Sequence, residues 1–147
     1  MTPRQELDGF IKKFGPETAK NAQAALKKVR ALLPGAQQLV YDNYNALAIG
    51  FCGSEKTSEI ALSIAVYPRW VSLFLVGGPK LKDPKKLLRG GGTTVRHIVL
   101  EPVTLLDSPD VKALVKQAVA LAKAPIPRGG RGGIIIKSVS PKQRPRR

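Results

Sequence analysis

Residues 37–76, QQLVYDNYNALAIGFCGSEKTSEIALSIAVYPRWVSLFLV, decide the fold because they contain four strand-like segments joined by short links. The segments 37–41, 46–51, 60–67 and 70–76 are rich in β-branched and aromatic residues, and turn-forming residues separate them. Links this short cannot hold a parallel crossover. We therefore expect the four segments to pair as an antiparallel meander.

Helical patterns flank this meander on both sides. Thr2 and Gln5 form a capping-box pattern that begins a first helix, and Gly15-Pro16 separates it from a second. A fifth strand is expected over 94–100, and a last amphipathic helix over 109–123. This order predicts an α+β domain, in which an antiparallel sheet of about five strands packs against N-terminal and C-terminal helices.

The charge distribution divides the chain into a body and a tail. The chain has 25 Lys and Arg residues against 10 Asp and Glu residues, a formal net charge of +15. We expect one domain over residues 1–124, followed by a basic, Pro/Gly/Arg-rich and flexible tail over 125–147 that contains no acid. The isoleucines at 134–136 fit a flexible tail poorly and leave two arrangements open: they pin the tail onto the body, or they form a short edge strand.

Several functional classes have no support in the sequence. No apolar run approaches the roughly 20 residues that span a bilayer, and the polar first eight residues are unlike a signal peptide. We therefore expect a cytoplasmic protein with no membrane partner. His97 and Cys52 are the only residues of their kinds, and no catalytic partner for either is recognisable. The expectation is a non-enzyme with no cofactor and no metal site; the sequence gives no oligomeric state.

Aromatic and cationic residues gather at the expected strand ends and turns. Tyr and Trp rings with neighbouring guanidinium groups stack planar anionic ligands or bases, although packing at the sheet margin also explains such residues. The predicted function is a binding module for an unknown small or anionic ligand. Its candidate ligand-binding residues are Tyr41, Tyr44, Tyr67, Arg69, Trp70 and Arg96.

An alternative function is association with nucleic acid through the basic tail and a basic helix face. Each Lys or Arg that contacts a phosphate releases a counterion, and Arg-Gly-Gly sequences such as 128–130 are typical of flexible nucleic-acid-binding segments. A plainer role for the tail is to keep the protein in solution. The candidate nucleic-acid-binding residues are Arg128, Arg131, Lys137, Lys142, Arg144, Arg146 and Arg147.

Several blocks of the chain resemble, in order and spacing, the YdhG-like domain family, a bacterial family of largely unknown function. The blocks are 40–47, 67–71, 82–84 with 87–88, 91–92 and 96–98, and the resemblance covers about residues 5–123. It implies a frataxin-like α+β fold and, as a weaker alternative function, an intracellular iron chaperone. The few carboxylates of the N-terminal region, Glu6, Asp8 and Glu17, do not form the acidic ridge that iron binding of this type uses.

Overall fold

The computed structural model describes residues 1–147, which fold around one mixed sheet of six strands in the order β5-β4-β3-β2-β1-β6. The helices are α1 (Pro3–Lys12), α2 (Pro16–Leu32) and α3 (Pro109–Leu121). The strands are β1 (Gln37–Asp42), β2 (Leu47–Cys52), β3 (Ile60–Val66), β4 (Val71–Val76), β5 (Val95–Val99) and β6 (Ile134–Val139). The predicted α+β class is confirmed, and β1 to β5 form the expected antiparallel meander.

The helices begin where the sequence predicts. Thr2 caps α1 in a full capping box with Gln5, and the Ser108 side chain accepts a hydrogen bond from the Val111 amide at the start of α3. These bonds satisfy amide groups that the first turn of a helix leaves without partners. Pro16 stands at the first position of α2, where its missing N–H costs nothing.

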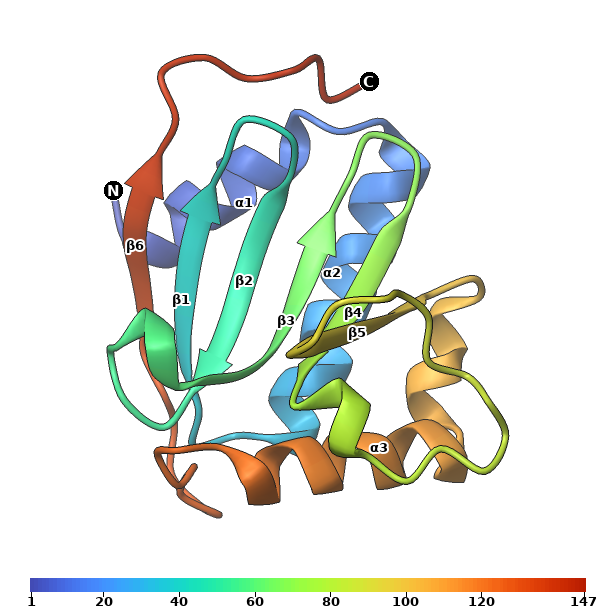
Figure 1. Cartoon of the computed structure of the whole chain (residues 1–147). Coiled ribbons are helices and arrows are strands. Elements are labelled where there is room, and N and C mark those ends of the chain that lie inside the picture. The colour runs from blue at the N-terminus through green and yellow to red at the C-terminus, as the bar shows by residue number, and fades with distance from the viewer.

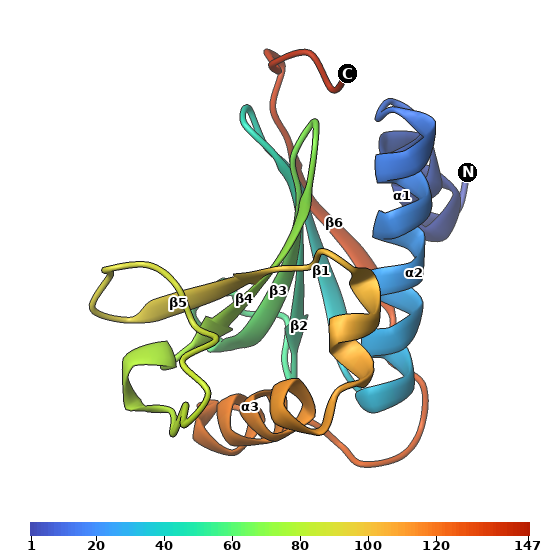
Figure 2. The same cartoon turned by 90° about the vertical axis from the view of Figure 1, so that its right-hand side faces the viewer.

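The hydrophobic core lies on one face of the sheet. Ile49, Ile64 and Leu73 are neighbours across β2, β3 and β4, and all three are buried in one apolar cluster with residues from the helices. Figures 1 and 2 show α1 and α2 along this face and α3 across the lower end of the strands. The opposite face, toward the viewer in Figure 1, carries no long helix.

The sixth strand corrects two expectations, an all-antiparallel sheet and a flexible tail over 125–147. Strand β6 pairs with β1 in parallel, with Ile135 opposite Leu39, and the register shifts between Val40 and Tyr41. The open edge of β1 offers backbone groups to a β-branched segment, and Ile134 and Ile136 pack against the core. Of the two arrangements open to residues 134–136, the structure therefore shows the edge strand.

Glycines bring the segment before β6 close to the body. A Cβ at Gly35 would lie 2.2 Å from the Pro127 carbonyl oxygen, and a Cβ at Gly132 would lie 1.6 Å from that of Ala36. The Gly132 amide donates to the Pro34 carbonyl at 2.9 Å. Only residues without side chains allow this approach, so these glycines fix the path into β6.

None of the helices has the length and apolar character required to cross a membrane.

Candidate functional site

The turns of two β-hairpins lie side by side at one end of the sheet. Strands β2 and β3 pair antiparallel with Leu47 opposite Val66, so the β1–β2 turn and the β3–β4 turn are neighbours. Both turns are at the upper end in Figure 1. The first contains Tyr44, and the second is bounded by Tyr67 and Trp70. Three of the predicted ligand-binding residues therefore meet at one end of the molecule.

The aromatic rings in the second turn are stacked and accessible. The Tyr67 and Trp70 ring centroids are 4.8 Å apart at an interplanar angle of 17°, and Trp70 is 41% exposed. Their neighbours Val66 and Val71 are buried in the core, so strand alternation directs both rings to the face without a long helix. Tyr44 in the adjacent turn is 51% exposed. Large aromatic side chains left in solvent on neighbouring turns are typical of a binding surface.

The C-terminal segment after β6 adds cations to the same end. The Ser140 amide donates to the Asp42 carbonyl at 2.8 Å, and the Arg144 amide donates to the Tyr44 carbonyl at 2.9 Å. Lys142 and Arg144 are exposed and lie on this segment next to the first turn. We call the group Tyr44, Tyr67, Trp70, Lys142 and Arg144 the hairpin end. It combines members of both predicted site sets.

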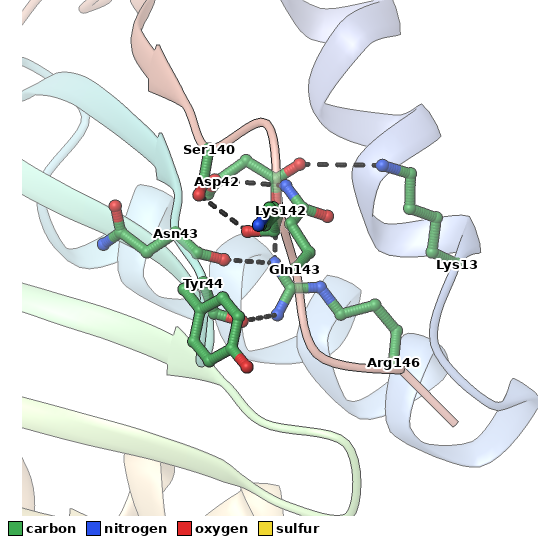
Figure 3. A network of polar contacts seen from close by, with 8 residues as sticks. All are labelled: Lys13, Asp42, Asn43, Tyr44, Ser140, Lys142, Gln143 and Arg146. Atoms are coloured by element: carbon green, nitrogen blue, oxygen red, sulfur yellow. Dashed lines mark hydrogen bonds and ion pairs between the residues drawn. The ribbon is translucent and has the colours of Figure 1, made fainter.

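A buried ion pair fixes this segment in place. Arg146 Nη2 lies 2.9 Å from Asp42 Oδ1, and the two side chains are 4% and 1% exposed. Arg146 also donates to the Asn43 carbonyl at 2.6 Å, and Lys13 Nζ lies 3.7 Å from Asp42 Oδ2 (Figure 3). Sequence reasoning placed Arg146 among the nucleic-acid-binding cations, but its guanidinium is occupied in a structural contact.

The other three predicted ligand-binding residues point elsewhere. The Tyr41 hydroxyl bonds to the Thr57 hydroxyl in the loop before β3. Arg69 is exposed in the second turn but lines a cavity beside α2 with Glu17 and Glu101, whose charges oppose anion binding. Arg96 lies on β5 and donates to the carbonyls of residues 92 and 95. Tyr41 and Arg96 therefore make their contacts away from the Tyr67–Trp70 pair, and Arg69 shares the turn of that pair but lines another cavity.

The remaining tail cations are dispersed. Arg128 and Arg131 precede β6, near the opposite end of β1 from the hairpin end. Lys137 donates to the Glu55 carbonyl at 3.1 Å, and Arg147 donates to that of Lys13 at 3.2 Å. The tail therefore does not present its seven cations as one surface.

The structure offers no protein ligand set for a metal ion, because nowhere do three or more His, Cys, Asp or Glu side chains lie close enough to hold one. Comparisons with protein-family models, curated proteins and solved structures find no match for this chain. Membership of the YdhG-like family therefore stays a prediction.

Proposed function

We propose that this protein is a non-catalytic binding module for an anionic ligand with planar rings, and that single-stranded nucleic acid fits its surface best. The observation that carries the proposal is the stacked Tyr67–Trp70 pair, with Trp70 41% exposed, in the turn next to the one that binds the segment carrying Lys142 and Arg144. Aromatic rings stack bases, and cations hold the phosphates that link them.

The geometry favours a single strand over a duplex. Bases in a duplex are stacked on one another and cannot lie on a protein ring, whereas the bases of a single strand splay out and stack on exposed aromatic side chains. The sheet face opposite α1 and α2, to which strand alternation directs the two rings, carries no long helix that would exclude a strand (Figure 1). A net charge of +15 attracts the strand over distances longer than direct contact.

We place this activity in the cytoplasm. Cys52 is buried and unpaired, as is usual in a reducing compartment. The iron-chaperone alternative is not taken further, since it lacks a ligand set in this fold.

The test is the affinity of the full-length protein for a fluorescently labelled single-stranded oligonucleotide, followed by anisotropy. Loss of a stacked base costs about 1–3 kcal/mol, so Trp70→Ala and Tyr44→Ala are each expected to weaken binding by roughly tenfold. Leu121→Ala is the control, because Leu121 is 52% exposed on α3 at the other end of the molecule.

Two outcomes would overturn the assignment. Equal losses in Trp70→Ala and Leu121→Ala would show that the hairpin end has no special role. If a mononucleotide binds as tightly as the oligonucleotide, the ligand of this surface is a small molecule and not a nucleic-acid strand.

A further inference from the structure

A second site lies at the opposite end of β1, on the side of the sheet that carries the helices. The N-terminus of α1, the C-terminal turn of α2 and the segment before β6 enclose a cavity of about 770 Å³. Arg4, Arg30 and Arg131 line it, and none of the lining residues is acidic. We call this cavity the arginine cleft.

Arg30 is the most constrained of the three cations. Its Nε donates to the Gln38 side-chain oxygen at 2.8 Å, while its Nη2 is shielded from solvent and has no hydrogen-bond partner. A buried donor without a partner is costly and rare in folded proteins. The Arg30 guanidinium therefore has hydrogen-bonding capacity that Gln38 does not use.

The positive charge of the cleft is incompletely neutralised. Burial first, and the charge of Arg4 second, lower the pKa of Arg30 to about 10, while Asp8 opposes these effects. Asp8 is shared between two partners: its Oδ1 lies 3.6 Å from Arg4 Nε and accepts from Gln23 Nε2 at 3.1 Å. Arg4 and Arg30 therefore share one divided carboxylate, and the positive end of the α1 dipole adds to the potential of the cleft.

Arg131 is presented to the cleft by a fixed backbone. Gly130 has φ +85°, a conformation that residues with side chains rarely adopt, and Gly132 is held against Ala36 and Pro34. This arrangement directs the segment along the cleft before it enters β6.

We propose that the arginine cleft binds the phosphate groups of a phosphorylated small molecule. The fork of a guanidinium group matches phosphate oxygens in pairs, and a phosphate with nearly two negative charges balances several arginines better than a carboxylate does. The cavity volume falls in the range of small-molecule sites, and Leu33 and Ile134 offer apolar surface for the organic part. This site is separate from the hairpin end, so each proposal stands or fails without the other.

Calorimetric titration of the full-length protein with inorganic pyrophosphate at low salt tests the proposal. Arg131→Gln and Arg4→Gln are each expected to weaken binding about tenfold, the worth of one charge-assisted hydrogen bond. Arg128→Gln removes the same charge from the same segment outside the cleft and is expected to change affinity less than about twofold. Arg30→Lys keeps the charge and loses the fork, and it should also weaken binding while the protein remains folded.

Three kinds of result would overturn the proposal. The first is a failure of specific binding, either because pyrophosphate does not bind saturably or because Arg128→Gln and Arg131→Gln weaken binding equally. The second is binding of succinate as tight as that of pyrophosphate, which would exclude a preference for phosphate. The third is an oligonucleotide whose 5′-phosphate raises affinity in an Arg131-dependent manner, which would assign the cleft to strand ends instead of small molecules.

Discussion

At the scale of single residues, the buried pair of Asp42 and Arg146 joins the C-terminus to the β1–β2 turn. Removing two charges from water costs free energy, and Arg146 Nε has no hydrogen-bond partner. The pair therefore fixes the position of the C-terminal segment more than it adds to the free energy of unfolding. Its position matters because it holds Lys142 and Arg144 beside Tyr44. Breaking it from one side, however, leaves a buried charge without compensation.

Arg146→Gln is therefore expected to lower the free energy of unfolding by about 3 kcal/mol, because Asp42 stays buried and keeps only the longer ion pair with the half-exposed Lys13 side chain, at 3.7 Å. Urea denaturation measures this. Arg144→Gln is the matched control, since only its backbone bonds to Tyr44, and it should change stability by less than about 0.5 kcal/mol. Equal effects of the two substitutions would contradict the structural role of the pair.

Arg30 is a residue whose buried charge lowers the free energy of unfolding. Folding lowers the pKa of Arg30 from its ordinary value to about 10, mainly through burial, so the unfolded chain holds this proton more tightly than the folded one. The charged guanidinium therefore opposes folding at every pH below about 10, and its cost to stability is expected to decrease as the pH rises above about 10. A residue retained at such a cost is typical of a binding site.

Replacing both members of the Arg30–Gln38 contact tests whether Arg30 serves binding at a cost to stability. The double variant Arg30→Met with Gln38→Leu removes donor and acceptor together, so the free energy of unfolding should stay within about 0.5 kcal/mol of the wild type or rise. Pyrophosphate should raise the Tm of the wild type and not that of the variant. A loss above about 2 kcal/mol in urea denaturation would show that the contact serves stability instead.

At the scale of elements, local patterns predicted the helices and β1 to β5 closely, because capping residues, turn residues and alternation are encoded nearby in the chain. The parallel strand β6 could be offered only as one of two arrangements. Its pairing joins Ile135 to Leu39, far apart in sequence, and the exposed Lys137 and Ser138 interrupt its apolar pattern. Whether such a segment forms a strand depends on its tertiary contact with the open edge of β1.

The close contacts of glycines before β6 allow a test of how β6 is held against β1. Gly132→Ala would place a methyl group against the Ala36 carbonyl, so the segment must shift, and we expect a loss of at least about 2 kcal/mol in the free energy of unfolding. Gly129→Ala is the control, because nothing lies within 4 Å of its Cβ position. Comparable stability of both variants in urea denaturation would mean that β6 does not depend on this close approach.

At the scale of the whole molecule, the sequence predicted the types of residue in the site better than their grouping. Tyr44, Tyr67 and Trp70 meet because adjacent hairpins turn at the same end, which the meander implies. Lys142 and Arg144 join them only because β6 returns the chain to that end. The arginine cleft could not be predicted either, since the sequence indicated only a basic helix face and gave no sign that Arg30 would meet the segment at 130–134 in a cavity.

The salt dependence of binding should reflect which cations contact phosphate. Lys142→Gln with Arg144→Gln is expected to reduce the slope of log affinity against log salt concentration by about 1.4, because each lost contact with a single strand removes about 0.7. Lys112→Gln with Lys116→Gln removes two exposed charges from α3 and should leave the slope nearly unchanged. Equal reductions in slope would indicate attraction by net charge alone.

The fluorescence of Trp70 tests the central claim most directly, because Trp70 is the only tryptophan in the chain and stands in the hairpin end. Titration of the full-length protein with an unlabelled single-stranded oligonucleotide should quench this emission saturably, as bases stack on the ring, with the midpoint at the dissociation constant from anisotropy. Unchanged emission while anisotropy reports saturated binding would show that the strand binds elsewhere and would contradict the account.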